Sequence, residues 1–240
     1  MVQEGCGLNR HLAIFGAVAL LAALGFTGLG FWQLERLRAK NALVAAIEQR
    51  IAAEPVDLNQ DGIWERFNPE RDEYRPVIVR GRFDHGAETL VQAVTAHGGG
   101  FWVVTPLALS DGRSVLVNRG FVPPERREPG TRPGPEDEVS ISGLLRRSEP
   151  NGGFLRGNDP VAERWYSRDV QAIAQNKKLR GAAPFFVDAD EDQPGAYPIG
   201  GLTVLSFPNS HLGYALTWFA LAGMVVGGFG YVVWEGRRTK

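Results

Sequence analysis

The chain has 240 residues, a formal net charge of −1 at pH 7 and a single cysteine, Cys6. The near-zero charge excludes a global field that would recruit nucleic acid, and the lone cysteine excludes an internal disulfide. Between two apolar segments near its ends, the chain has the composition of one water-soluble domain of about 175 residues, which is enough to bury a core.

The first apolar segment, residues 12–34, contains no Asp, Glu, Lys or Arg. A helix of this length spans about 34 Å, which is enough to cross the hydrocarbon core of a bilayer. The apolar run continues past Ala19, where a small-residue cleavage site is possible, so a retained anchor is predicted rather than a signal peptide. The sequence therefore predicts a cytoplasmic N-terminus over residues 1–11 and a transmembrane helix over 12–34.

The next predicted region is a domain over residues 35–211. Apolar residues keep a helical spacing until Glu54-Pro55, which predicts that the first helix runs on into water. Short runs rich in Val, Ile, Phe, Trp and Thr then predict strands. These runs are 75–83, 88–93, 101–107, 114–122, 139–145, 184–188 and 202–207. With one further helix over 160–179, the pattern predicts an antiparallel β-rich domain, either a sheet or a partly closed barrel, with one or two helices.

The second apolar segment, residues 212–234, is followed by a tail over 235–240. Arg237, Arg238 and Lys240 lie in this tail, and no basic residue closely precedes the segment. Basic residues flanking a span stay on the cytoplasmic side, so the tail is predicted to be cytoplasmic and the domain to lie outside.

The first segment favours the opposite orientation, because more basic residues follow it than precede it. We give more weight to the second segment, because its flanking basic residues all lie on one side. The prediction is an α+β membrane protein of the bacterial inner membrane, multi-pass, with two transmembrane helices flanking a periplasmic domain.

The search for catalytic groups is negative. The sequence has no GxSxG elbow, HExxH motif, P-loop or Rossmann glycine pattern. His85 and His97 lie beside glycines in predicted loops. The acidic run at 188–192 is interpreted as either a divalent-ion site or a hydrated turn, and it lacks the spacing of a calcium loop. The prediction is that the protein is not an enzyme.

His211 directly precedes the second apolar segment, so its imidazole is predicted to lie at the membrane–water boundary. A neutral imidazole there can bind iron or copper, and a flat apolar macrocycle could lie on the helix face shared by Tyr214 and Trp218. The alternative is an ordinary interfacial histidine near a helix start. From the residues alone, the alternative is favoured.

Two further patterns leave alternatives open. Asn118-Arg119-Gly120 ends a predicted strand, either as a bent strand end or as a polar contact to a partner. Gly223 and Gly227 form a GxxxG pair, which predicts close packing of the two spans on each other or of one span on a partner.

Several segments together resemble the surfeit locus protein 1 family of cytochrome c oxidase assembly factors, bacterial type. The segments that carry the resemblance are Gly30–Gln33, Tyr74–Val77, Phe101–Leu107, Val115–Pro123, Pro198–Gly201 and Asn209–Phe219. Their order and spacing along most of the chain make the resemblance specific.

The resemblance implies the same layout of two spans around one external domain. It implies assistance to subunit I of a haem-copper oxidase, with haem a as a transient cofactor. Haem A synthase and membrane lipid are further predicted partners. It implies that His211 is an axial ligand of the haem iron. Tyr214 and Trp218, which share the helix face of His211, are the predicted cofactor contacts, and Asn118 and Arg119 are the predicted partner contacts of a domain that serves as a docking platform. No nucleic-acid partner is expected.

The predicted function is to hold or deliver haem a during oxidase biogenesis. Two alternatives remain: a membrane scaffold that stabilises unfinished subunit I without binding haem, and a membrane-tethered hydrolase.

Overall fold

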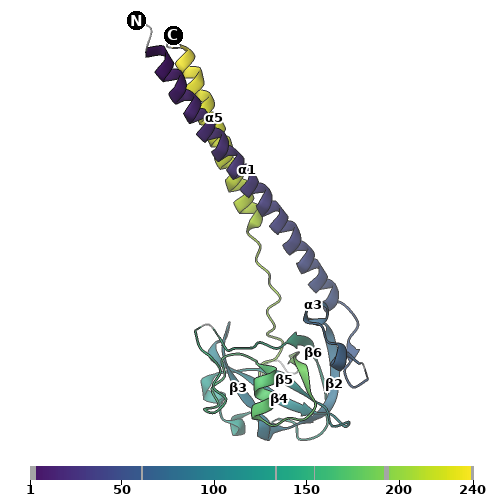
Figure 1. Cartoon of the computed structure of the whole chain (residues 1–240). Helices are drawn as coiled ribbons and strands as arrows, with labels where there is room; N and C mark the ends of the chain where they lie inside the picture. The colour runs from purple at the N-terminus through teal and green to yellow at the C-terminus, as the bar shows by residue number, and fades with distance from the viewer. Residues whose placement is uncertain (1–3, 61, 133, 154, 192–194, 239–240) are drawn as a thin grey trace. The chain divides into compact units, whose positions relative to one another are not determined.

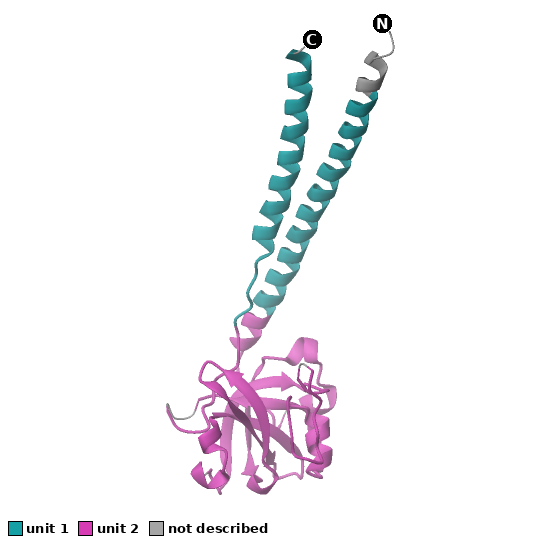
Figure 2. Cartoon of the chain, turned by 90° about the vertical axis from the view of Figure 1, so that its left-hand side faces the viewer, with its two compact units in different colours: residues 1–46, 206–240 teal, residues 47–205 magenta. Residues whose placement is uncertain are grey.

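The structure is a computed structural model that describes residues 4–60, 62–132, 134–153, 155–191 and 195–238 (Figure 1). It divides into two compact units (Figure 2). The helical unit comprises Met1–Ala46 and Ser206–Lys240, and the barrel domain comprises Ile47–Leu205.

The helical unit contains α1 (Glu4–Ile51), whose last turn belongs to the barrel domain, and α5 (His211–Arg238). By length and composition both helices can cross a membrane. Their outward side chains are large and apolar, with Leu21 and Met224 both more than 60% exposed. In water such surfaces would be costly, so the pattern fits helices surrounded by lipid.

The two helices pack antiparallel, with aromatic rings of α5 set against α1. Phe219 contacts Phe31 edge-on with ring centroids 5.4 Å apart. It also faces Gly30, where an added Cβ would come within 2.6 Å of the ring. Phe229 and Gly16 repeat this arrangement near the other end of the helices. Glycine is therefore required on α1, because only a missing side chain makes room for each ring.

The GxxxG pair of α5 does not take part in this packing. A Cβ added at Gly223 or Gly227 would meet nothing within 4 Å, and both residues are exposed. Of the two predicted alternatives, the packing of the spans on each other is observed, but other residues provide it.

The barrel domain contains a seven-stranded sheet within the described residues. Its strands are β1 (Val56–Asp57), β2 (Pro76–Phe83), β3 (Thr89–Thr95), β4 (Gly98–Ala108), β5 (Ser114–Val122), β6 (Val139–Arg147) and β7 (Ala182–Ala189). Strands β2, β6, β7, β5 and β4 form a closed five-stranded barrel, because the end of β2 also pairs with β4. The predicted β-rich fold flanked by two long helices is confirmed, and the barrel is fully closed.

Most strand pairs are antiparallel, but the pairs β1–β2 and β5–β7 are parallel. The long connection from β6 to β7 contains α4 (Val170–Asn176) and allows β7 to insert between β6 and β5, antiparallel to β6 and therefore parallel to β5. Short helices α2 (Ile63–Arg66) and α3 (Pro69–Asp72) precede β2. Single 3-10 turns lie at His85–Ala87, Pro124–Arg126 and Pro129–Thr131.

Two apolar clusters explain why the central strands are apolar on both faces. On β5, Val115 and Val117 point into the barrel cluster, whereas Leu116 points to an outer cluster. On β7, Phe185 and Phe186 divide in the same way. Each buried Phe side chain contributes about 1.5–3 kcal/mol, so both layers stabilise the domain substantially.

Two predicted elements are wrong. The helix expected over 160–179 is reduced to α4, because Asn158 accepts hydrogen bonds from the backbone N–H groups of Tyr166 and Ser167. These contacts hold the first half in turns. Residues 202–207 form no strand either, although Thr203 in that segment makes a side-chain contact described below.

Candidate functional site

The first residue of α5 is held by polar contacts to the preceding loop and to α1. The Asn209 side chain accepts from the backbone N–H of His211 at 3.3 Å and donates to Asn41 of α1 at 2.9 Å. Lys40 donates to the carbonyl of Pro208. These contacts fix the start of α5 against one side of α1.

One further hydrogen bond involves the imidazole of His211 itself. Its Nδ1 lies 2.7 Å from Oε1 of Gln33, a residue of α1 that is only 9% exposed. An amide oxygen can only accept, so with Oε1 facing the ring, a neutral His211 has its proton on Nδ1. In the neutral ring, the lone pair is then on Nε2.

This arrangement fits a metal ligand. Histidines that bind metals commonly donate their other ring N–H to an acceptor, which sets the tautomer and the ring orientation. His211 is half-buried, and among the described residues Gln33 is the one recorded partner of its ring. The residues present therefore fit an axial imidazole ligand with one coordinating nitrogen.

The other two predicted cofactor contacts have different surroundings. Tyr214 is 56% exposed on α5. Trp218 is half-buried and stacks on Phe26 of α1, with ring centroids 5.7 Å apart and planes inclined by 24°. Trp218 thus contributes to helix packing, and the predicted contact of both residues with a cofactor stays a prediction.

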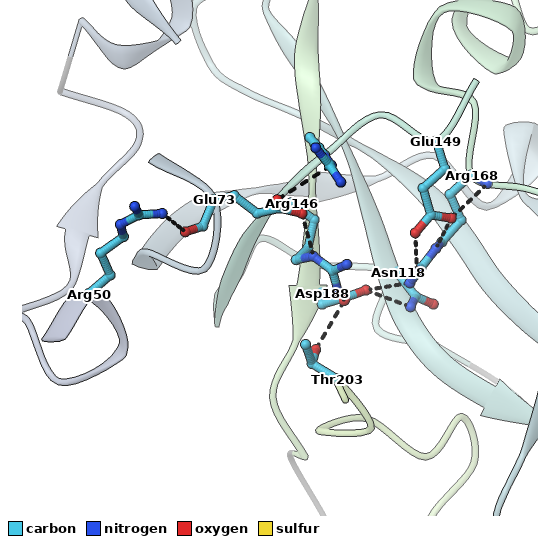
Figure 3. Close-up of polar contacts among 9 residues, drawn as sticks. Arg50, Glu73, Asn118, Arg146, Glu149, Arg168, Asp188 and Thr203 are labelled. Atoms are coloured by element: carbon cyan, nitrogen blue, oxygen red, sulfur yellow. Dashed lines mark hydrogen bonds and ion pairs between the residues drawn. The ribbon is translucent and has the colours of Figure 1, made fainter. Parts of the chain in front are cut away.

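The barrel domain has a second polar site, centred on Asp188 of β7 (Figure 3). Its carboxylate accepts from Asn118 at 2.7 Å, Arg146 at 2.8 Å, Arg168 at 2.9 Å and Thr203 at 3.0 Å. The Asp188 side chain is 5% exposed. Four donors saturate this buried carboxylate, so it has little capacity to take up a further ligand.

The two arginines that bind Asp188 have acidic partners of their own. Arg168 forms a bidentate pair with Glu149 at 2.6 and 3.0 Å, and Arg146 reaches Glu73 at 3.3 Å. Burial acts to lower the pKa of Arg146, but Asp188 and the other nearby acidic groups raise it above its ordinary value. The charges compensate one another, so the cluster is suited to holding strands together.

The divalent-ion interpretation of the acidic run is not supported by this geometry. Asp188 is committed to arginines, and Asp192 lies outside the described residues. Within the ranges that the structure describes, no group of three His, Cys, Asp or Glu residues is placed to hold a metal ion.

Asn118 and Arg119, the predicted partner contacts, lie on opposite faces of β5. Asn118 is 4% exposed, and it lines a cavity of about 130 Å³ beside Asp188. Arg119 lies 3.7 Å from Glu88, which Arg132 holds more closely at 2.6 Å. Burial lowers the pKa of Arg119 despite the opposing charge of Glu88. A contact of either residue with a partner stays a prediction.

The glycine of the Asn-Arg-Gly sequence is structurally required. Gly120 has a φ of +129°, and an added Cβ would come within 2.2 Å of the carbonyl oxygen of Ile199. The interpretation as a bent strand end therefore describes the backbone at this position.

Sequence reasoning did not single out Gln33, Arg146 or Arg168. A signal existed for Gln33, because it is a polar residue inside a predicted span, where polar groups usually have a partner. Arg146 and Arg168 are two of many arginines in the chain, and their convergence on Asp188 depends on the closure of the barrel.

Comparison with known proteins gives consistent matches along the chain. The model of the SURF1 family matches residues 20–223, a range that contains both Gln33 and His211. Surfeit locus protein 1 of Mus musculus is 40% identical over 222 residues, which cover 84% of this chain and 70% of the relative. The Homo sapiens protein of the same name is 39% identical over 226 residues, covering 85% and 73%. A SURF1-like protein of Drosophila melanogaster is 34% identical over 236 residues, covering 89% and 76%.

Proposed function

This chain belongs to the SURF1 family, and from that premise we propose that it is a membrane-anchored assembly factor for a haem-copper (cytochrome c) oxidase. Its role is to hold haem a or to deliver it to subunit I during oxidase biogenesis. The role is non-catalytic, and haem A synthase is a proposed upstream partner.

The observation that carries the haem proposal is the His211 imidazole. Its Nδ1 is engaged by Gln33 at 2.7 Å, so Nε2 would be the atom that binds the haem iron. Bound haem a would supply an iron centre with an open coordination position for this nitrogen. Coordination by His211 alone would hold the cofactor and still allow its release, which delivery would require.

The proposed setting is the bacterial inner membrane, with α1 and α5 as the spans and the barrel domain in the periplasm. Basic residues at the end of α5 support a cytoplasmic C-terminus. Reporter fusions at the C-terminus and within the barrel domain test the orientation. A barrel domain that reports from the cytoplasm would refute it.

The barrel domain is proposed as the docking platform for the oxidase subunit. Arg119 supports this role because its cation is only partly buried, and Glu88, the acid 3.7 Å away, is paired more closely with Arg132. Asn118 is the other proposed contact, reached through the cavity beside Asp188.

A scaffold that never binds haem is the second candidate. One observation favours it: Gly223 and Gly227 leave a small-residue face of α5 open to another helix. Oxidase deficiency without the protein, together with a purified protein that carries no pigment, would support this candidate.

The test of haem binding uses the full chain purified in detergent from cells that make haem a. The absorption spectrum of the wild type is compared with those of His211→Ala and of His97→Ala, a control in the β3–β4 hairpin. We expect pigment in the wild type and in His97→Ala, and a loss of most of it in His211→Ala. An unchanged spectrum in His211→Ala would remove this residue from the site.

A further inference from the structure

Gln33 is a buried polar side chain in the packed face of α1. It is 9% exposed, and Gly30, one turn before it, faces the ring of Phe219. A buried amide is costly in apolar surroundings unless it is hydrogen-bonded. Its bond to the His211 ring offsets that cost and directs the amide oxygen toward α5.

We propose that Gln33 is the positioning residue of the His211 site: it holds the imidazole in the Nδ1–H tautomer and leaves Nε2 as the only coordinating nitrogen. The role of Nε2 as a haem ligand rests on the proposed function. The hydrogen bond itself depends only on contacts within the helical unit.

The neighbouring side chain of Asn209 does not take over this task. The amide oxygen of Asn209 accepts from the backbone N–H of His211, and its amide nitrogen donates to Asn41. Both ends of the Asn209 side chain are therefore occupied. A neutral histidine in water favours the Nε2–H tautomer, so without Gln33 the coordinating nitrogen would be protonated for most of the time.

The arrangement also connects ligand binding to helix packing. Gln33 and His211 lie on different helices, 178 positions apart in the chain. The Phe219–Gly30 contact sets the approach of α5 to α1 beside this hydrogen bond. An imidazole prepared for coordination therefore exists only when the two helices are packed together.

The experiment is nitrogen NMR of the full chain in detergent, with ¹⁵N-labelled histidine and no haem. The chain has 4 histidines, and the His211→Ala variant assigns the signal of His211. Three variants are compared with the wild type: Gln33→Leu removes the acceptor, Gln33→Glu retains it, and Gln49→Leu is the matched control at an exposed position of α1.

We expect the Nδ1–H tautomer in the wild type, in Gln33→Glu and in Gln49→Leu, and a shift toward Nε2–H in Gln33→Leu. Haem a extracted from a purified oxidase is then titrated into each protein. Loss of an orienting partner lowers metal affinity by roughly 10- to 100-fold, and we expect that loss in Gln33→Leu alone. Rescue by Gln33→Glu separates positioning from a general packing defect.

An Nε2–H tautomer in the wild type, or the same tautomer in the wild type and Gln33→Leu, would overturn the inference. The proposed function fails differently: if the tautomer shifts as expected but the wild type takes up no haem a, Gln33 still positions the imidazole and the haem proposal is refuted.

Discussion

The two units use buried polar groups in opposite ways. In the barrel domain, the carboxylate of Asp188 accepts from four donors, and its arginine partners have further acids. In the helical unit, the buried amide of Gln33 engages Nδ1 of the half-buried His211 imidazole, and Nε2 has no partner among the residues that the structure describes. A carboxylate whose acceptor positions are all hydrogen-bonded stabilises the fold. An imidazole with only one hydrogen-bonded nitrogen retains the capacity to bind a ligand through the other.

Replacing Asp188 gives the largest expected effect. Asp188→Ala removes the carboxylate that Arg146 and Arg168 share in the protein interior. Loss of one partner from a buried ion pair lowers the free energy of unfolding by about 3–5 kcal/mol, and we expect a loss of this size. The measurement is urea unfolding of the full chain in detergent, followed by tryptophan fluorescence.

The matched control is Asp111→Ala, since Asp111 pairs with Arg113 at an exposed turn with 45% of its side chain accessible. We expect the control to cost less than about 1 kcal/mol. Equal costs for the two variants would show that the Asp188 cluster is not the stabilising centre of the barrel domain.

An intermediate effect is expected from a pair of glycines in the helical unit. Gly30→Ala places a Cβ within 2.6 Å of Phe219, whereas Gly223→Ala places one in open space. Overpacking costs about 1–3 kcal/mol, so Gly30→Ala should weaken helix packing and Gly223→Ala should not. Thermal unfolding of the two variants in detergent measures the difference, and a greater loss in Gly223→Ala would contradict the observed packing.

The smallest expected effect is a pH dependence in the barrel domain. Burial opposes ionisation of Asp72, but hydrogen bonds from Arg71 and the backbone of Asn68 lower its pKa below the ordinary value. The unfolded chain then takes up the proton first as pH falls. The stabilisation from this carboxylate is complete above about pH 4 and is lost as pH falls through its folded pKa.

The check is the urea midpoint at pH 7 and at pH 3 for the wild type and Asp72→Asn. We expect the wild type to lose more stability on acidification than Asp72→Asn does. Asp137→Asn, in an exposed loop, serves as the control and should behave like the wild type. An identical pH response in all three proteins would exclude Asp72 as a source of acid sensitivity.

Much of the fold could be predicted from local sequence patterns. The predicted strand 114–122 coincides with β5, because its residues are buried on both faces and bounded by turns. The helix over 160–179 could not be predicted correctly, because the side chain of Asn158 captures backbone groups eight and nine positions away. In this segment, the hydrogen bonds of the Asn158 side chain outweigh the local helix propensity.

The candidate site was predictable in part. The place of His211 at the start of α5 follows from the end of the polar segment before it. Its pairing with Gln33 depends on the register of two antiparallel helices, which no local pattern specifies. The same holds for Asp188, whose partners come from strands and loops joined only when the barrel closes.

The most direct test of the central claim is resonance Raman spectroscopy of the ferrous haem-loaded protein, with natural and ¹⁵N-labelled histidine. The account predicts an iron–nitrogen band that shifts on labelling in the wild type and is absent in His211→Ala. A band that does not respond to the label, or one that persists unchanged in His211→Ala, would contradict the assignment of His211 as the ligand.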